Sequence, residues 1–424
     1  MDKKREKDHT KRFPWLHVRT LGLIVFIGIN LRTALLAIPP IVPLLSHDLH
    51  LTYTQTGLLT SLPTLVMGVV SLPIGLLIGR WGGRIMVAFG LLLVALGACL
   101  RALWPAVLPL YLFTALLSLG SACSQTAIPA LIRQWFSTRI GLATALYSDG
   151  LVIGETLGAM LTIPVMLNWF GRDTWTGTFV FWSIPVVIAL VLWLWLAPAN
   201  TVNQRRLTFK QAGSSPHRSS RRFVPVNPWT LGLLVGGAQL IYFGTNAWIA
   251  SYNQAVHAPA LTWLALGVLN AAQLPASLFA TLFAHKLVGR KLPFIICALL
   301  CLIALVCWIW TPVILEPLWA AVIGGTTILL YTLAITLPAL LAKEEEVAPW
   351  TGTMLTVGYL FSFLGPFIGG WLWDMVHIPA IAFLPLALAS GVVLVLGVLL
   401  PIQQPPAHRA SHRVGGESRE LRIN

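Results

Sequence analysis

The chain has 424 residues, of which 57% are hydrophobic and only 10% are charged, and its formal net charge is +14. A typical soluble domain has about 25% charged residues, so this composition excludes an ordinary water-soluble protein. Long apolar segments recur from end to end, and each is close to the ~20 residues with which a helix crosses a bilayer. A membrane β-barrel would show short alternating segments instead. The composition predicts an all-α integral membrane protein whose main surroundings are the lipid bilayer.

The apolar segments predict twelve membrane-spanning helices in chain order. The first six lie at residues 21–45, 56–78, 85–104, 108–132, 140–167 and 179–196. The second six lie at residues 231–252, 263–287, 292–310, 318–341, 353–373 and 380–400. The first, fourth, fifth and eighth are longer than a bilayer requires, which predicts tilts or kinks. These four helices contain prolines at which a kink is expected: Pro39, Pro40, Pro129, Pro164 and Pro275.

A polar, basic segment rich in Ser and Pro separates two sets of six helices. We expect an N-terminal arm at 1–20, one half at 21–197, a linker at 198–228, the second half at 229–400 and a tail at 401–424. The halves repeat each other, because Gly79-Arg80 recurs as Gly289-Arg290 and the segment GETLGA at 154–159 recurs as GPFIGG at 365–370. Such duplicated bundles bind their ligand near the membrane midplane, between the halves.

The positions of the Lys and Arg residues follow the predicted membrane topology. Lys and Arg gather in the arm, the linker, the tail and alternate short loops, whereas only Arg101 and Arg172 are expected on the opposite side and Arg32 lies within a span. Basic residues favour the cytoplasmic side of a membrane, so both termini are expected in the cytoplasm of a multi-pass inner-membrane protein. Because topology explains the charge, no nucleic-acid partner is expected. The first apolar segment is too long for a cleavable signal.

Glycines recur at four-residue intervals in two of the predicted helices. Gly150, Gly154 and Gly158 form a stripe on the fifth helix, and Gly365 and Gly369 form one on the eleventh, with Pro366 beside it. Stripes of small residues let helices approach closely. Two roles are open for them: a sliding surface between the halves, or static packing.

Three charged residues lie at bilayer depth, where a charge normally faces a cavity or a partner. At 1.5 Å per residue, Arg32 lies roughly 18 Å from the cytoplasmic face, Asp149 roughly 13 Å and Glu155 roughly 22 Å. Arg32 either anchors an anionic substrate through its planar fork or ties the first helix to the fifth as a counter-ion. Glu155 and Asp149 are candidates for proton coupling, and the alternative for Glu155 is a permanent pairing with Arg32.

Uncharged polar residues also follow helical spacing, so they share faces that are expected to line the path of the substrate. The alternative is hydrogen bonding between helices. Trp248 is expected as a cavity wall, with an interfacial aromatic as its alternative. The complete predicted substrate-binding set joins these residues to Arg32: Asn30, Gln125, Gln239, Tyr242, Asn246, Trp248, Asn270, Gln273, Tyr331 and Tyr359.

Several short motifs resemble known sequences. The segment from Gly75 to Arg84, with Gly82, resembles the loop signature of the major facilitator superfamily, except that Gly79 stands where that signature has an acid. The segments NLR at 30–32, IPALIR at 128–133 and VGYL at 357–360 resemble the cyanate/nitroimidazole transporter family within it. This resemblance implies a fold of two six-helix halves that contact each other through the fifth and eleventh helices, and traffic in small anions or small nitrogen heterocycles.

These observations favour a secondary transporter that moves a small solute by alternating access, with coupling to protons left open. The alternative is a proton-driven efflux antiporter for drugs or heterocycles. The sequence has no phosphate-binding loop for ATP and no converging catalytic set, so neither an enzyme nor a cofactor is expected. No metal is expected either, because His47-Asp48-Leu49-His50 reads best as a solvated loop. We expect a monomer.

Overall fold

The computed structural model describes residues 3–136, 139–170, 175–198, 227–342 and 346–400. Nearly all of the predicted linker at 198–228 and the whole predicted tail at 401–424 lie outside these residues. Helices account for almost all of the described chain, and no strand occurs in it. The predicted all-α fold is therefore confirmed.

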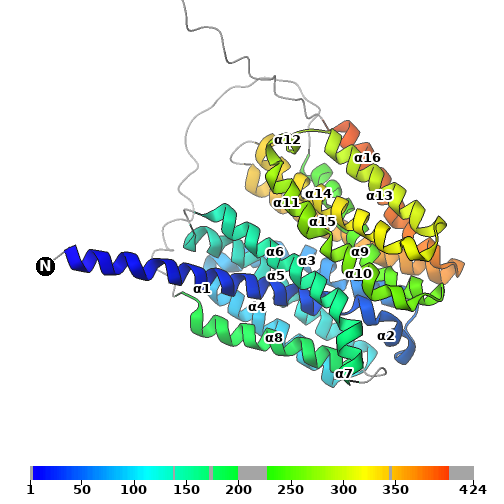
Figure 1. Ribbon diagram of the computed structural model, residues 1–424, viewed down its shortest axis with the longest axis horizontal. Coiled ribbons are helices and arrows are strands. Elements are labelled where there is room, and N and C mark those ends of the chain that lie inside the picture. The colour runs from blue at the N-terminus through cyan, green and yellow to red at the C-terminus, as the bar shows by residue number, and fades with distance from the viewer. Residues whose placement is uncertain (1–2, 137–138, 171–174, 199–226, 343–345, 401–424) are drawn as a thin grey trace, which may run out of the picture.

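The helices form two bundles that follow each other in the chain (Figure 1). The first contains α1 (Lys3–Leu36), η1 (Pro39–Ile41), α2 (Val42–Asp48), α3 (Tyr53–Trp81), α4 (Gly83–Leu103), α5 (Val107–Trp135), α6 (Ile140–Leu161), η2 (Thr162–Leu167), α7 (Asn168–Phe170) and α8 (Trp175–Leu196). The second contains α9 (Pro228–Ala255), η3 (Pro259–Leu261), α10 (Thr262–Ala271), α11 (Gln273–Leu282), α12 (Ala284–Leu287), α13 (Leu292–Trp310), η4 (Val313–Leu315), α14 (Glu316–Leu341), α15 (Val347–Val376), η5 (Pro379–Phe383) and α16 (Leu384–Leu399).

Ten helical segments of the described chain are long and apolar enough to cross a membrane. The helix α3 makes an eleventh when its two bent segments are taken together. The remaining predicted span is α6, whose 22 residues are sufficient in length. Asp149 and Glu155 lower its mean hydropathy, and both are residues that the sequence marks as functional. The twelve predicted spans thus correspond to twelve helical segments.

Proline and helix breaks coincide in most of the predicted positions. The first span breaks at η1, the eighth breaks at Ala272 just before Pro275, and Pro164 lies in a π-helical segment that follows α6. By contrast, α5 continues through Pro129 without a break. An additional bend of 58° separates Tyr53–Ser71 from Pro73–Trp81 within α3. Pro73 explains this bend, because it cannot donate the backbone hydrogen bond of that turn.

The glycine stripe of α6 packs against α1 inside the first half. A Cβ at Gly154 would collide with the carbonyl oxygen of Ile29, and a Cβ at Gly150 would lie 2.8 Å from the carbonyl oxygen of Val25. Thr33 Oγ1 donates to the carbonyl oxygen of Gly154 at 3.0 Å, which closes the same contact. In this structure the stripe of Gly150, Gly154 and Gly158 therefore faces α1 of its own half, which favours the packing alternative over a sliding surface between the halves.

The predicted glycines elsewhere have mixed environments. Gly365 packs on Leu240, and Gly369 packs on Trp248, so both also contact their own half. Gly82 has a φ of 84°, a conformation that favours glycine, where α3 turns into α4. A Cβ at Gly75 would meet nothing within 4 Å, so this glycine is not in close contact with another helix. The carbonyl oxygen of Arg84 accepts a hydrogen bond from Trp193 Nε1 at 3.1 Å, which joins α4 to α8.

The halves also contact each other at the end of the bundle opposite the linker, which we call the distal end. There, Asp374 of α15 caps the first turn of α3: its Oδ1 accepts from the backbone N–H of Tyr53 at 2.9 Å, and its Oδ2 accepts from that of Thr54 at 2.7 Å. The ring of Tyr53 stacks on Trp373 with centroids 4.1 Å apart. Gly57 of α3 lies directly against the carbonyl oxygen of Pro366 of α15. A carboxylate at a helix N-terminus is favoured both as a cap and by the helix dipole, so this contact stabilises a closed distal end.

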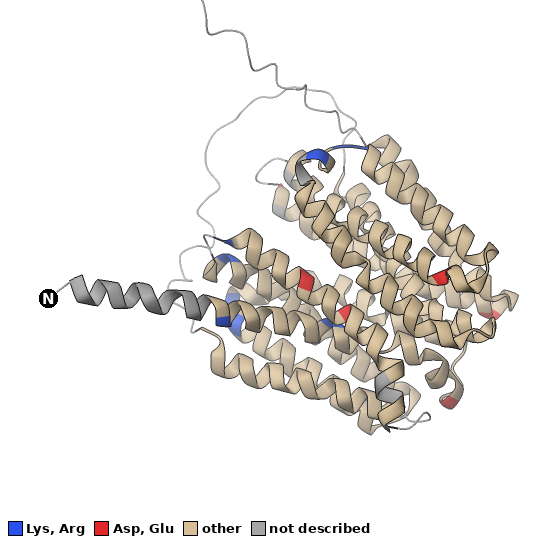
Figure 2. Cartoon of the chain, in the orientation of Figure 1, with Lys and Arg blue, Asp and Glu red and all other residues tan. Residues whose placement is uncertain are grey.

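Charge is distributed unevenly along the bundle. Most of the described Lys and Arg lie at the end where the linker and the termini attach, as Figure 2 shows. This distribution agrees with the bias expected of cytoplasmic loops, and it supports the predicted orientation of the chain.

The first prediction concerns topology. A reporter enzyme inserted within residues 199–222 should report a cytoplasmic location, because this segment carries a dense group of basic residues. A periplasmic signal from that fusion would overturn the predicted orientation.

The second prediction concerns the distal end. Asp374→Ala leaves the N-cap of α3, Thr52, in place but removes the carboxylate that accepts from the N–H groups of Tyr53 and Thr54. This loss costs about 1 kcal/mol and therefore raises the population open at the distal end roughly fivefold. The measurement is the alkylation rate of Thr60→Cys, which lies between Arg32 and the distal end, in a protein whose five native cysteines have been replaced. Asp48→Ala is the matched control, because Asp48 accepts from Trp175 of its own half. Equal alkylation rates in the two variants would contradict the capping role.

Candidate functional site

A cavity of about 170 Å³, lined by polar, aromatic and aliphatic side chains, lies between the two halves. Such a volume has room for roughly ten water-sized groups. On α6 its lining begins at Ser148 and ends at Glu155, so the cavity extends from Glu155 toward the linker end. Residues of both halves line it: Arg32, Gln125, Ser148, Leu151, Val152, Glu155, Ala238, Gln239, Tyr242, Phe243, Gln273, Thr327, Ile328, Tyr331 and Tyr359.

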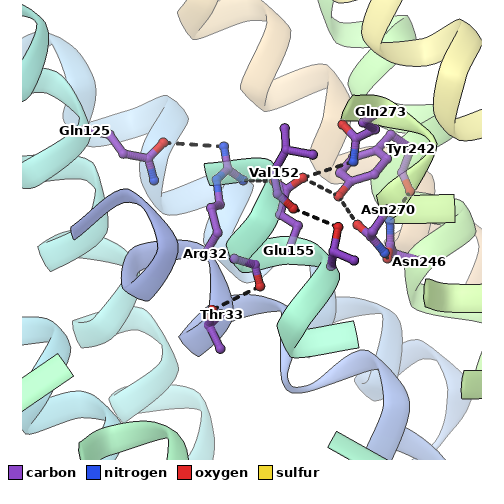
Figure 3. A network of polar contacts seen from close by, with 11 residues as sticks. Arg32, Thr33, Gln125, Val152, Glu155, Tyr242, Asn246, Asn270 and Gln273 are labelled. Atoms are coloured by element: carbon purple, nitrogen blue, oxygen red, sulfur yellow. Dashed lines mark hydrogen bonds and ion pairs between the residues drawn. The ribbon is translucent and has the colours of Figure 1, made fainter. Parts of the chain in front are cut away.

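Arg32 stands at the closed end of this cavity. Its side chain is only 11% exposed, and it lies between Gln125 and Glu155 (Figure 3). Nη2 donates to Gln125 Oε1 at 3.4 Å, Nη1 lies 3.3 Å from Glu155 Oε1, and Nε has no hydrogen-bond partner among the described residues. Charge-assisted pairs normally have distances of about 2.7–2.9 Å. The guanidinium therefore keeps donor capacity that its present neighbours do not use.

Glu155 connects the halves. Its side chain is 6% exposed, and its Oε1 faces Arg32 of α1 in the same half. Its Oε2 lies 2.7 Å from Tyr242 Oη of α9 and accepts from Gln273 Nε2 of α11 at 3.1 Å. The carboxyl group of one half is thus held by two polar groups of the other half (Figure 3).

Two asparagines extend this network into the second half. Asn270 Oδ1 is hydrogen-bonded to Tyr242 Oη, and Asn270 Nδ2 donates to Asn246 Oδ1 at 2.9 Å and to the carbonyl oxygen of Leu266 at 2.8 Å. Asn246 Nδ2 in turn donates to the carbonyl oxygen of Tyr242 at 3.1 Å. All of these groups are buried, so each needs the partner that it has.

Most of the predicted polar residues come together around Arg32. Gln125, Gln239, Tyr242, Gln273, Tyr331 and Tyr359 line the cavity, and Asn246 and Asn270 form the layer behind Tyr242. Helical spacing indicated the shared faces of Gln239, Tyr242 and Asn246 and of Asn270 and Gln273, whereas Gln125, Tyr331 and Tyr359 were expected from their polarity at bilayer depth.

Three predicted residues lie elsewhere. Asn30 donates to the carbonyl oxygen of Phe26 within its own helix, at 2.7 Å. Trp248 is fully buried against Trp373, with ring centroids 5.6 Å apart, so it belongs to the core near the distal end and is not a cavity wall. Asp149 is half-buried on α6 and is not among the residues that line the cavity. Only Glu155 of the two predicted carboxylates meets Arg32.

Sequence reasoning also missed buried charges near the distal end. Arg101 was expected on the side opposite the cytoplasm, but it is fully buried, because its side chain packs into the bundle near the end of α4. It donates to the carbonyl oxygen of Ala34 at 3.2 Å and lies 3.8 Å from the ring centroid of Phe179. Glu316 is buried as well, with 1% exposure. In the sequence, Arg101 and Glu316 each lie near the end of an apolar segment, and this position does not distinguish a buried side chain from an exposed one.

The groups at the site can form hydrogen bonds to a ligand and can compensate a charge on it. The site joins one guanidinium, one carboxyl group and several amide and hydroxyl groups at the meeting of two halves, which suits a small polar or anionic ligand. The described residues contain no group of three or more His, Cys, Asp and Glu side chains that could hold a metal ion.

Known proteins similar to the chain are transporters. Cyanate transport protein CynX of Escherichia coli is 30% identical over 361 residues, which cover 82% of this chain and 88% of that protein. The 2-nitroimidazole transporter of Escherichia coli is 26% identical over 382 residues, covering 88% of this chain and 93% of that protein. These relatives confirm the prediction that the chain is not an enzyme.

Solved structures support the same fold. An inward-facing, unoccupied bacterial homologue of the human lysosomal transporter Spinster aligns with a TM-score of 0.68 at 14% identity, over 93% of this chain and 100% of that one. The nucleoside transporter NupG, solved as a point variant, aligns with a TM-score of 0.69 at 13% identity, over 92% of this chain and 100% of that one. The sequence model of the Major Facilitator Superfamily matches residues 21–339. The chain is therefore a multi-pass membrane transporter that belongs to the major facilitator superfamily.

Proposed function

We propose that this transporter moves a small monovalent anion, such as cyanate, across the cell inner membrane by alternating access, and that protons drive it. The cavity between the halves is the binding site, and Arg32 is the group that holds the charge of the substrate.

The observation that carries this proposal is the incomplete pairing of Arg32. The guanidinium is buried, its two contacts to side-chain oxygens are 3.3 Å and 3.4 Å long, and its Nε–H is unpartnered among the described residues. A buried donor without a partner costs about 1–3 kcal/mol. An anion in the cavity would remove this cost and would receive a planar fork of donors.

The relatives support a small substrate. One is named for cyanate and the other for 2-nitroimidazole. Cyanate is a linear monovalent anion, and 2-nitroimidazole is a single planar ring, so both fit a cavity of about 170 Å³. Closure of the distal end by Asp374 and Trp373 supports a cavity reached from the linker side in this conformation.

A second candidate is efflux of a neutral heterocycle in exchange for protons. The aromatic side chains of Phe243, Tyr331 and Tyr359 favour it, because they line the cavity and offer faces on which a planar ring can stack. Proteoliposomes separate the candidates: an inward proton gradient accelerates uptake of an anion in symport, whereas the same gradient expels a heterocycle in antiport.

The third prediction tests the anchor. Arg32→Lys keeps the charge but loses the fork, so the affinity for cyanate should fall roughly tenfold or more, about 1.4 kcal/mol. The measurement is cyanate uptake into proteoliposomes over a range of concentrations, together with the thermal stability of the same preparation.

Arg139→Lys is the matched control, because Arg139 is exposed at the start of α6 and lies outside the cavity. Arg139→Lys should transport cyanate at the wild-type rate. If a stable Arg32→Lys protein also transports cyanate at the wild-type rate, the role of Arg32 is contradicted. Loss of stability without a change in affinity would instead make Arg32 a structural counter-ion.

A further inference from the structure

Arg32 also lines a second, smaller cavity of about 30 Å³. We infer that this cavity is a second subsite for one small monovalent anion, halide-sized or linear, through which the anion passes on its way to or from the distal end. We call it the distal compartment, and we call the cavity of about 170 Å³ the main cavity. The place of the distal compartment in transport rests on the proposed function, whereas its binding of an anion does not.

The distal compartment lies on the far side of Arg32 from the linker. The helix α9 follows the linker and runs toward the distal end. The lining of the main cavity takes Ala238 to Phe243 from this helix, and the lining of the distal compartment takes Phe243 to Ala247. The distal compartment is thus one step further along the same helix. A solute that enters from the distal end reaches it before it reaches the main cavity.

Two residues separate the two spaces. Arg32 of α1 and Phe243 of α9 are the described residues that line both of them. The Cζ atom of Arg32 lies 5.9 Å from the ring centroid of Phe243, within the range of a cation–π contact. Each half supplies one member of this pair, so the partition between the two spaces opens when the halves move apart.

The charged groups around the distal compartment favour an anion more than those around the main cavity do. Arg32 lines both spaces, but Glu155 lines only the main cavity, and no carboxyl group is among the described residues that line the distal compartment. A guanidinium has five N–H donors, and its contacts with Glu155 and Gln125 use two of them. An anion on the distal side therefore meets the guanidinium without meeting a carboxyl group.

Further polar groups of the lining can also donate to an anion. Asn246 Nδ2 carries two hydrogens, and its contact with the carbonyl oxygen of Tyr242 uses one of them. Thr60 and Thr64 donate to carbonyl oxygens of their own helix, and a hydroxyl hydrogen can rotate toward a bound anion. An entirely apolar void stays dry, whereas this compartment joins donors of both halves.

The volume of the distal compartment limits the class of ligand. A water-sized group needs ~10–15 Å³ of such a volume, so the compartment holds roughly two. A halide ion or a linear triatomic anion fits this space, whereas a nitro-substituted five-membered ring does not. The compartment therefore favours a small anion over a heterocycle as the substrate, which deepens the proposed function.

The first test locates the anion directly and uses bromide as the probe. Anomalous diffraction from crystals of the wild-type protein in bromide should show a peak on the distal side of Arg32, between the guanidinium and Ala247. The absence of a peak there would overturn the inference, whether or not the main cavity is occupied. A distal peak that persists in Arg32→Gln would mark an adventitious ion only, and it would overturn the inference as well. The wild-type measurement does not depend on whether any variant folds.

The second test uses azide, a linear monovalent anion whose infrared stretch shifts with its surroundings. The wild-type protein should show two bands of bound azide, one for each space. Ala247→Val should remove one band, because the added methyl groups fill most of the distal compartment. Ala238→Val is the matched control: Ala238 lies on the same helix, is equally buried and lines only the main cavity, so this band should remain. A single band of bound azide that Ala247→Val leaves unchanged would contradict a second subsite.

The third test places the compartment on the path of the substrate. Ala247→Val should lower the maximal rate of cyanate uptake into proteoliposomes roughly tenfold and leave the half-saturating concentration nearly unchanged, because the main cavity is intact. Ala238→Val should instead raise the half-saturating concentration. If the wild-type protein binds azide in both spaces but does not transport cyanate, the proposed substrate fails and the second subsite stands. If Ala247→Val loses its azide band and still transports cyanate at the wild-type rate, the compartment is not on the path.

Discussion

The central constraint in this structure is a guanidinium that is only 11% exposed and only partly paired, at a depth where lipid cannot solvate it. Removing an ion from water costs several kcal/mol even after relaxation. Arg32 is compensated only in part, by Glu155 at 3.3 Å and Gln125 at 3.4 Å. The deficit supports the proposal that the cavity receives negative charge, and it accounts for the polar side chains of both halves that converge at this depth.

The first half is closely packed around this charge. Gly154 lets α6 approach the backbone of α1 at Ile29, and Thr33 Oγ1 donates to the carbonyl oxygen of Gly154 at 3.0 Å. These contacts join α1 and α6, so Arg32 and Glu155 lie on one packed pair of helices. Tyr242 and Gln273, the other partners of Glu155, belong to the second half.

The sequence predicted the depth of polar residues in the membrane better than the direction in which each side chain points from its helix. A helical rise of 1.5 Å per residue placed Arg32 and Glu155 near each other, and spacing of three or four residues grouped Tyr242, Asn246, Asn270 and Gln273. Rotation of a helix about its axis depends on packing, which spacing does not determine. Asn30, two residues before Arg32, consequently bonds its own helix, and Trp248 fills the core instead of the cavity. Arg101 shows the same limit at a helix end.

The two halves contribute different polar groups to the cavity: the charged side chains come from the first half, and the second half adds only uncharged groups. Among the described residues that line the cavity, the charged side chains, Arg32 and Glu155, both belong to the first half, and the second half contributes amides, hydroxyls and rings. Since Leu266 orients Asn270, and Asn270 is hydrogen-bonded to Tyr242, the second half meets the carboxyl group of Glu155 through the hydroxyl of Tyr242 and the amide of Gln273. Under the proposed function, the anion then finds its charged partner, Arg32, in the first half and only dipoles and rings in the second.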